Sequence, residues 1–438
     1  MNKIIAAIAL ALVCKMSFSQ SIDAEKLNTY FDVLEKNNKF MGSVSIHQNG
    51  KEIYAKSIGF ADVANQQKAN ENTKYRIGSI TKTFTAALVF KAIEEKKLSL
   101  TQSINRFFPQ QKNAEKITIA QLLSHRSGIG NFTSDDRFPK WRTEAKTKAE
   151  MLKIINQSGI DFAPDSTAKY SNSNYVLLTY ILEDVYKKPY QEILNKKIIK
   201  KIGLKNTYFG SAINAKNNEA YSYKFRENWV KDDETNMSIP LGAGGVVSTP
   251  KDLNLFVDAL FAGKIISKKN VEIMKPKNAN IGMGLLLPPY KNKSGFGHNG
   301  SIDAFSSFFI IFPKDNIVFS VTSNGSNMSM NAINETLIKA IYNEAFEIPQ
   351  FKTFAVTAES LEPYLGVYAN EKAPFKLTIT KTGNTLQVQP TGQPVFDLVA
   401  TEKDVFEYEK RKVTIRFHPE KMMLNFKMGE RVMDFVKE

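Results

Sequence analysis

Apolar and polar residues alternate in two hairpin-like stretches that lie far apart in the chain. Residues 42–62 alternate, turn at Asn49-Gly50 and return through a second alternating run. An Asn-Gly pair between alternating runs is a strong hairpin signal, because both residues tolerate the positive φ angles of a tight turn. Residues 305–325 repeat the pattern around a turn at 313–316. We therefore expect two antiparallel β-hairpins.

A periodicity near 3.6 residues predicts helices around and between these hairpins. Residues 22–35 and 331–346 each show one apolar face, and residues 79–275 are rich in helical patterns. Within that region Thr249-Pro250 marks a helix start, with threonine as the N-cap and proline in the first turn. Strands near both ends with helices between them predict an α+β domain. Its antiparallel sheet would be built from the N- and C-terminal segments, flanked by helices, with an inserted helical region.

The pattern changes after a stretch that looks like a linker. From Leu361 onward, short alternating runs are separated by turn residues, at 375–380, 386–390, 413–417 and 422–428. Such runs are typical of a small all-β domain, either a sandwich or a barrel. We therefore divide the chain into a signal peptide at 1–19, an α+β domain at 20–347, a linker at 348–360 and an all-β domain at 361–438.

The first 19 residues have the layout of a secretory signal peptide. Lys3 gives a basic start, an apolar run extends from Ile4 to Val13, and Ser17 and Ser19 supply small residues before the cleavage site. The run is about half of the ~20 residues that a membrane span needs. Cys14, the only cysteine of the chain, follows a bulky valine, which argues against lipid attachment. We expect a secreted or periplasmic protein with no disulfides and no stable membrane span after cleavage.

Charge narrows the classes of partner. The formal net charge is +15, and cleavage of the signal peptide would lower it by two. A basic protein can favour anionic partners such as cell-wall polymers or lipid head groups. The lysines are scattered along the sequence and accompany no nucleic-acid-binding motif, so a solvated basic surface is the simpler interpretation and no nucleic-acid partner is expected.

The sequence lacks the motifs of several common kinds of catalytic and binding site. The four histidines form no HExxH motif and no close cluster with acids, so we expect neither a metal site nor another cofactor. We expect His125 to brace a loop, and His47 and His418 to lie at the surface. There is no G-x-S-x-G elbow and no G-x-x-x-x-G-K-[ST] phosphate-binding loop. What remains is the motif S-x-x-K, which occurs three times: Ser79-Lys82, Ser166-Lys169 and Ser248-Lys251.

Context separates these three pairs. Ser248 precedes a helix cap and Ser166 follows a Pro-Asp pair in a loop-like stretch, whereas Ser79 opens a strongly helical run. The apolar residues of this run form one stripe, at Ile80, Phe84, Ala87 and Leu88. Residues three apart on a helix are neighbours, so the Lys82 amine can reach the Ser79 hydroxyl. Unpaired N–H groups at a helix start would also stabilise a developing oxyanion. On this stretch alone an alternative stays open, in which Ser79 caps the helix and Lys82 is solvated.

Two further segments contain residues that could act together with Ser79 and Lys82. Tyr170 and Asn172 lie in YSN just before an apolar helix, and His298 and Gly300 lie in HNG at a strand start. SITK, YSN and HNG in this order resemble the three motifs of the serine β-lactamase and penicillin-binding-protein superfamily. The likeness is greatest to the branch that includes class C β-lactamases, DD-carboxypeptidases, D-aminopeptidases and esterases. The phrases LLSHRSGI and GAGGVVSTPKDL also resemble that branch, and the resemblance covers roughly residues 22–346.

The resemblance implies a role for each catalytic position. Ser79 would attack a carbonyl carbon and become acylated. Lys82 would take or relay its proton, which requires an amine that is neutral part of the time. Tyr170 would protonate the leaving group and activate the deacylating water. It is also the second candidate base, but only if its pKa falls well below the usual value of about 10. The choice of acylation base between Lys82 and Tyr170 stays open at this point.

The resemblance also implies the binding positions. Asn172 would hydrogen-bond both the substrate and the lysine amine, and backbone N–H groups of Ser79 and Ser301 would form the oxyanion hole, with Gly300 allowing close approach. One position departs from the pattern. His298 stands where the family often has a lysine, and a histidine is mostly neutral at pH 7, so it offers a weaker site for a substrate carboxylate.

These features predict an exported serine hydrolase that cleaves an amide or ester through an acyl-enzyme. The histidine favours peptidase, D-aminopeptidase-like or esterase action over efficient β-lactamase action. The expected substrate is a small molecule or peptide, with peptidoglycan-derived peptides as one source. The alternative is a non-catalytic penicillin-binding-like or cell-wall-binding protein that keeps the fold. The C-terminal domain resembles the small lipocalin-like or jelly-roll-like appendages that follow this catalytic domain in many bacterial relatives.

Overall fold

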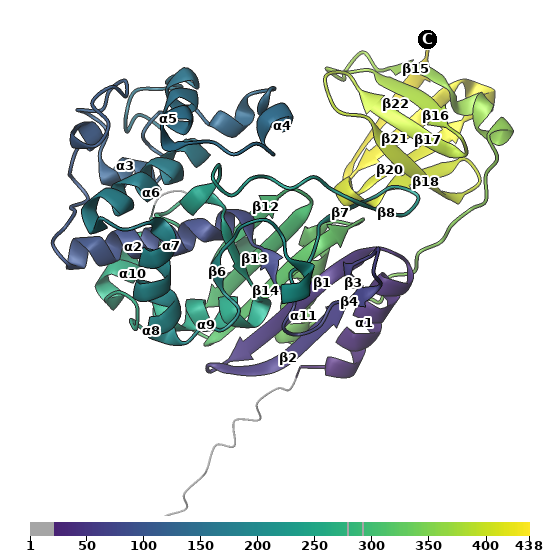
Figure 1. Ribbon diagram of the computed structural model, residues 1–438. Coiled ribbons are helices and arrows are strands. Elements are labelled where there is room, and N and C mark those ends of the chain that lie inside the picture. The colour runs from purple at the N-terminus through teal and green to yellow at the C-terminus, as the bar shows by residue number, and fades with distance from the viewer. Residues whose placement is uncertain (1–21, 278–279, 291–292) are drawn as a thin grey trace, which may run out of the picture.

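The computed structural model of the protein describes residues 22–277, 280–290 and 293–438. The expected signal peptide at 1–19 therefore lies outside the described residues. Figure 1 shows an α+β domain with a central sheet beside a smaller all-β domain in yellow. Within the described ranges, no helix is long and apolar enough to cross a membrane. The same residues contain no group of histidine, cysteine, aspartate or glutamate side chains placed to hold a metal ion.

The α+β domain is built on a five-stranded antiparallel sheet with the order β12-β13-β14-β1-β2. Its strands are β1 (Phe40–Gln48), β2 (Lys51–Ile58), β12 (Phe296–Ile302), β13 (Phe305–Phe312) and β14 (Ile317–Ser326). The first strand along the chain pairs with the last, so that Val44 lies opposite Val321. Asn49 and Gly50 close the first hairpin with φ angles of 53° and 72°. The predicted fold class, with both ends of the domain sharing one sheet, is confirmed.

Helices cover both faces of this sheet (Figure 1). α1 (Ala24–Lys36) and α11 (Met330–Ile341) share one apolar core with the sheet. α9 (Pro250–Phe261) packs against β1 and β14. Thr249 caps α9 as predicted, because its side chain accepts a hydrogen bond from the Asp252 N–H at 3.2 Å.

The inserted region is helical, as expected. Its helices are α2 (Thr81–Glu94), α3 (Ile119–Leu123), α4 (Phe138–Trp141), α5 (Lys148–Gln157), α6 (Asn172–Tyr186), α7 (Tyr190–Leu194), α8 (Lys200–Ile202) and α10 (Lys268–Met274). The single apolar stripe expected for α2 is wrong, since every residue from Thr81 to Phe90 is buried. The buried hydroxyls are satisfied: Thr83 donates to Gly284 O and Thr85 to Gly242 O, each at 2.7 Å.

The C-terminal domain is a closed eight-stranded barrel rather than a sandwich. Its strands follow each other around the barrel: β15 (Gly366–Ala369), β16 (Leu377–Thr382), β17 (Thr385–Pro390), β18 (Phe396–Glu402), β19 (Val405–Tyr408), β20 (Val413–His418), β21 (Met423–Met428) and β22 (Arg431–Lys437). Pairing of β15 with β22 closes the ring, with Tyr368 opposite Lys437. The four predicted runs correspond to β16, β17, β20 and β21, and the other four strands were not predicted.

The barrel touches the α+β domain at one end. Glu409, in the turn between β19 and β20, forms an ion pair of 3.0 Å with Lys39 at the start of β1. The same lysine amine lies 4.5 Å from the ring centre of Phe351, in the segment that joins the two domains. In Figure 1 the barrel lies beside the short hairpin of β7 (Tyr223–Phe225) and β8 (Trp229–Lys231).

Candidate active site

Ser79 lies in a single 3₁₀ turn, Gly78–Ile80, which leads directly into α2. Its side chain makes no helix-capping hydrogen bond, and the N-cap position of α2 is Ile80. Lys82 is fully buried on the first turn of the helix. The alternative of a capping serine beside a solvated lysine is therefore wrong.

The Lys82 amine has three oxygen partners. It lies 2.9 Å from Ser79 Oγ, 2.8 Å from Asn172 Oδ1 and 2.6 Å from the carbonyl oxygen of Ala243. No carboxylate is among these partners. Burial lowers the pKa of Lys82 well below its ordinary value, because a desolvated ammonium ion is costly.

Asn172 is the first residue of α6, and its other groups are also fixed. Its backbone N–H donates to Asn131 Oδ1 at 2.9 Å, and its side-chain Nδ2 donates to the same oxygen and to Thr133 Oγ1 at 3.2 and 3.0 Å. These bonds turn its carbonyl oxygen toward Lys82. Asn131 was not among the predicted residues. Its position just after the LLSHRSGI phrase was the one sequence feature that could have pointed to it.

Tyr170 precedes α6 and packs on His125. The two rings are stacked with centres 4.4 Å apart and planes at 25°, and the Lys82 amine lies 4.9 Å from the tyrosine ring centre. Burial raises the pKa of Tyr170, and a hydrogen bond with Ser79 offsets this only in part. The depressed pKa that a phenolate base would need is therefore not found. His125 braces the neighbouring loop as predicted, since its Nδ1 accepts from the Ser171 N–H at 3.1 Å.

The third motif lies on β12, pressed against the turn that carries Ser79. A Cβ atom at Gly300 would lie 2.0 Å from Ile77 O and 2.3 Å from Ser307 Oγ, so only glycine fits there. A Cβ atom at Gly78 would lie 2.8 Å from the backbone nitrogen of Ser301. The backbone amide of Ser301 is thus next to the Ser79 turn, where the proposed oxyanion hole requires it.

His298 is 2% exposed and fixed in one tautomer. Its Nδ1 lies 2.6 Å from the carbonyl oxygen of Asn299, and because a carbonyl can only accept, Nδ1 carries the proton. Burial, with a smaller contribution from the Lys82 charge, lowers the pKa of His298 to about 3. The ring is therefore neutral at pH 7, as the sequence indicated.

A pocket of about 450 Å³ opens over Ser79, Asn172 and Ser301. Its larger apolar lining residues are Phe132, Phe138, Pro139, Ile239, Pro240 and Ile302. The lining also carries charges that are already paired: Lys224 lies 2.8 Å and Arg142 3.5 Å from Asp232. The pocket therefore offers an apolar surface and a rim whose cations have carboxylate partners.

A buried ion network supports this rim and was missed in the sequence. Asp303, at the β12–β13 turn, has a fully buried side chain that lies 2.9 Å from Arg76 Nη1 and 2.6 Å from Arg142 Nη1. It also accepts from the N–H and hydroxyl of Thr235 at 3.0 and 2.6 Å. The two members of each interacting pair are more than 60 positions apart in the sequence, so no short motif could have revealed them.

The remaining serine–lysine pairs are not brought together. Lys169 pairs with Asp161 at 2.7 Å, and Lys251 pairs with Glu52 at 2.9 Å. Ser248 is buried and bonded to Thr207 at 2.8 Å. Of the three S-x-x-K motifs, Ser79-Lys82 is the one whose hydroxyl and amine are in contact.

Known proteins are similar to this chain in sequence and in fold. Teichoic acid D-alanine hydrolase of Staphylococcus aureus (strain MRSA252) is 25% identical over 319 residues, which are 70% of this chain and 75% of that protein. The crystal structure of D-amino acid amidase from Ochrobactrum anthropi SV3 complexed with L-phenylalanine amide matches with a TM-score of 0.64 and 25% identity. That match covers 73% of this chain and 99% of the amidase chain.

A second solved structure matches more of the chain. The octameric penicillin-binding protein homologue from Pyrococcus abyssi has a TM-score of 0.67 at 22% identity and covers 94% of this chain and 100% of its own. The likeness of fold thus extends into the barrel. Together the fold, the site and the relatives define a serine hydrolase. The chain belongs to the Beta-lactamase family, whose profile matches residues 34–343.

Proposed function

We propose that the protein hydrolyses an amide or ester through an acyl-enzyme on Ser79, with Lys82 as the base. The contacts of the Lys82 amine carry this proposal. Two of its partners, Asn172 Oδ1 and Ala243 O, are carbonyl oxygens at 2.8 and 2.6 Å that can only accept hydrogen bonds. A neutral amine gives its two N–H groups to them and turns its lone pair to Ser79 Oγ at 2.9 Å. Burial of Lys82 favours this neutral form.

The reaction then proceeds in two halves. Ser79 Oγ attacks the substrate carbonyl carbon while its proton passes to Lys82 Nζ, and the oxyanion is held by the backbone N–H groups of Ser79 and Ser301. Tyr170, whose raised pKa keeps the phenol protonated, donates a proton to the leaving nitrogen or oxygen. Lys82 returns its proton to the Tyr170 oxygen. A water molecule then attacks the acyl carbon, its proton passes through Lys82 Nζ to Ser79 Oγ, and the acyl group leaves as the carboxylic acid.

The substrate class follows from the charges around Ser79. His298 is neutral, and Arg142 and Lys224 are paired with Asp232, so a substrate carboxylate finds no unpaired cation among the described residues that line this pocket. We therefore propose peptidase, D-aminopeptidase-like or esterase action on a substrate with an apolar side chain, and slow β-lactam turnover. The amidase and the D-alanine hydrolase among the relatives support a D-aminoacyl group.

The place of action is part of the same proposal. The expected signal peptide supports export, to the periplasm or out of the cell. D-amino-acid peptides derived from peptidoglycan are within reach there and fit the proposed substrate class.

A substrate panel tests the activity. The purified protein is assayed with nitrocefin, p-nitrophenyl esters and D-aminoacyl p-nitroanilides, and we expect the best ester or anilide to be turned over far faster than nitrocefin. Nitrocefin hydrolysis at rates typical of β-lactamases would contradict the inference that a neutral His298 disfavours β-lactam turnover. Ser79→Ala should abolish turnover and fluorophosphonate labelling. Absence of labelling in the intact protein would favour the non-catalytic alternative.

A further inference from the structure

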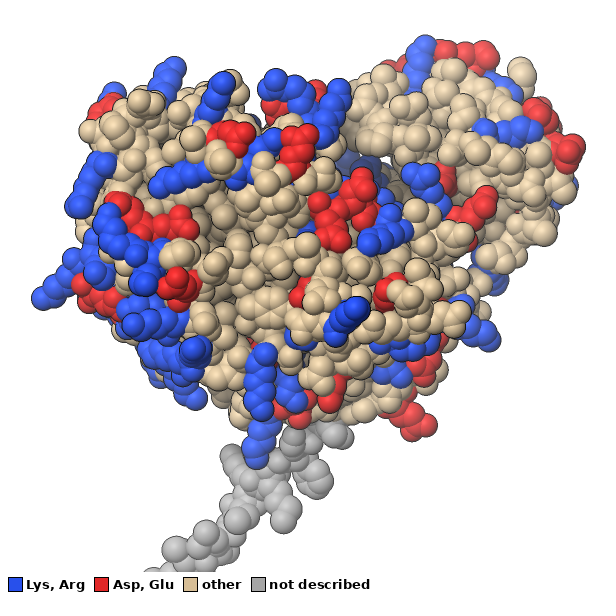
Figure 2. Space-filling model, viewed as in Figure 1, with Lys and Arg blue, Asp and Glu red and all other residues tan. Residues whose placement is uncertain are grey.

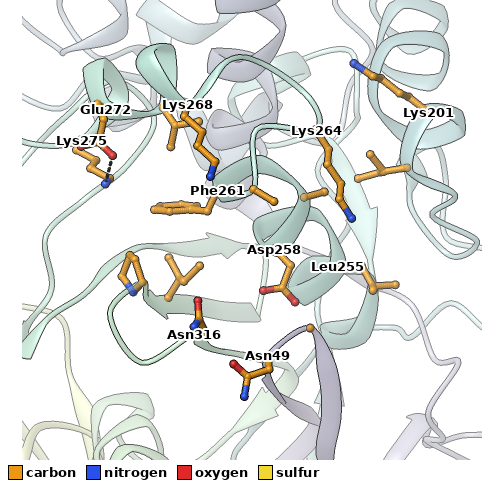
Figure 3. A pocket seen from close by; sticks show the side chains of 17 residues that line it. Asn49, Lys201, Leu255, Asp258, Phe261, Lys264, Lys268, Glu272, Lys275 and Asn316 are labelled. Carbon is orange, nitrogen blue, oxygen red and sulfur yellow. Dashed lines mark hydrogen bonds and ion pairs between the residues drawn. The ribbon is translucent and has the colours of Figure 1, made fainter.

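A second pocket lies away from Ser79, between α9, α10 and the turns of the β1–β2 and β13–β14 hairpins (Figure 3). Its volume is about 830 Å³, and it shares no lining residue with the pocket over Ser79. We propose that this lysine-rimmed pocket binds an anionic amphiphile, a phosphate or carboxylate group joined to an alkyl chain.

The charges that line the pocket favour an anion. Four lysines line it against two acids. One acid is already used, since Glu272 forms an ion pair of 2.5 Å with Lys275. Among the described residues, Lys201, Lys264 and Lys268 have no carboxylate within ion-pair distance. In Figure 3, Lys264 and Lys268 extend from above the pocket, toward Asp258 and Phe261.

The other acid, Asp258, contacts a histidine on strand β1 of the sheet. Asp258 Oδ2 lies 3.2 Å from Nδ1 of His47, which is 2% exposed on β1. The expectation that His47 lies at the surface is therefore wrong, because the side chain faces the α9 side of the sheet. This contact occupies one oxygen of Asp258. The Lys201 amine donates to the carbonyl oxygen of Ile265 at 3.3 Å, so Lys264 and Lys268 are the lysines that remain for the ligand.

The walls of the pocket are suited to an alkyl chain. They are formed by aliphatic and aromatic side chains: Ile202, Leu255, Phe261, Val271 and Ile311. Pockets of about 300–1,000 Å³ with apolar walls and a few polar groups are typical of small-molecule sites. A bare inorganic anion would use the lysines and leave this wall in contact with water. The lysines together with the apolar wall therefore favour a molecule that has both an anionic group and an alkyl chain.

The surroundings of the pocket attract the same class of ligand. Figure 2 shows basic side chains gathered over the region of α8 and α10. Lys200, Lys201, Lys268 and Lys269 are exposed there. A cluster of cations raises the local concentration of anions and speeds their association. Such a ligand could come from an anionic membrane surface or be a free amphiphile.

Calorimetry with the full-length protein tests the two parts of the ligand. The probes are dodecyl phosphate below its micelle-forming concentration, inorganic phosphate and dodecanol. We expect dodecyl phosphate to bind and the other two to bind at least tenfold more weakly. Decyl phosphate should bind about tenfold more weakly than dodecyl phosphate, because two fewer methylenes are buried. Equal binding of phosphate and dodecyl phosphate would overturn the proposal.

Variants locate the binding. Lys264→Glu combined with Lys268→Glu should weaken dodecyl phosphate at least tenfold, whereas Asp258→Asn should strengthen it. Ala262→Phe should block the chain by filling the pocket without a change of charge. The matched control is Lys112→Glu with Lys116→Glu, two exposed lysines outside the pocket lining. Equal loss in both lysine pairs would mean a diffuse charge effect and refute the site.

Vesicles distinguish the sources of the ligand. Sedimentation with phosphatidylglycerol vesicles that is lost in the lysine variant assigns the pocket to membrane lipid. Dodecyl phosphate binding that phosphatidylglycerol vesicles do not compete for assigns it to a free amphiphile. Turnover at Ser79 should be unchanged in every pocket variant, so this test stands apart from that of the hydrolase activity.

Discussion

Asn172→Asp tests whether Lys82 acts as the base, because it places a negative charge 2.8 Å from the lysine amine. A carboxylate there stabilises the ammonium form and raises the pKa of Lys82, which opposes the effect of burial. With an effective dielectric constant of about 20, Coulomb's law gives about 6 kcal/mol at this separation, or about four pKa units. The helix N-terminus favours the negative charge of Asp at the start of α6, although Asp loses the hydrogen bonds that the Asn172 amide donates to Asn131 and Thr133.

The expected result is a shifted pH profile. Below the pKa of Lys82, each unit of upward shift reduces the neutral amine tenfold, so kcat/KM at neutral pH should fall by up to about 10⁴-fold. The part of the loss that reflects protonation of Lys82 should recover as the pH rises, whereas the loss of the bonds to Asn131 and Thr133 lowers the rate at every pH. The assay is kcat/KM for the best substrate of the panel across the pH range in which circular dichroism shows a folded protein.

The matched control is Asn172→Ala, which removes the same hydrogen bond to Lys82 without adding charge. It should lower the rate and leave the acidic limb of the profile unmoved or shifted to lower pH. A uniform loss of activity in Asn172→Asp, with no upward shift of that limb, would refute Lys82 as the base. Tyr170 would then have to be reconsidered in spite of its raised pKa.

Three further outcomes follow from the buried groups. Gly300→Ala should abolish turnover and cost about 1–3 kcal/mol of unfolding free energy in urea, because the new Cβ meets Ile77 O at 2.0 Å; near wild-type kcat would contradict the close approach. Asp303→Asn should cost about 3–5 kcal/mol, since two arginines lose a fully buried counter-charge; a cost below about 1 kcal/mol, as for an exposed pair, would argue against the network. The unfolding free energy of Lys82→Met minus that of wild type should fall by about 1.4 kcal/mol per pH unit as the pH rises toward 10.5. The reason is that the unfolded wild type binds a proton at Lys82 in this range and the folded wild type does not. A pH-independent difference would mean that Lys82 stays charged in the folded protein.

Features encoded over short distances could be predicted from the sequence. The β1–β2 hairpin was predictable because Asn49-Gly50 adopts a turn that few other pairs tolerate. The segments around Ser79, Asn172 and Gly300 were also identified, each by a few residues of local spacing. The structure brings these three segments together around one pocket, although more than 90 residues separate them along the chain.

Features that depend on tertiary packing could not be predicted. The pattern of α2 suggested one apolar face, but neighbouring elements bury it on all sides, and buried threonines are satisfied by carbonyl groups that no local pattern reveals. Arg76 and Asp303 pair across 227 positions, so no motif relates them. The strands β15, β18, β19 and β22 escaped notice because a barrel is specified by closure as well as by alternation.

The titratable groups around Ser79 are related by one physical constraint. Burial lowers the pKa of Lys82, His125 and His298, and the Lys82 charge is a further cause for both histidines. Burial also raises the pKa of Tyr170, so its phenol stays neutral. A second cation at the position of His298 would oppose protonation of Lys82 during the attack, just when the lysine must hold the serine proton. A neutral histidine leaves that proton transfer favourable, at the expense of binding a substrate carboxylate. In the proposed mechanism, a neutral His298 would therefore assist acyl transfer from uncharged amides and esters while it disfavours β-lactam recognition.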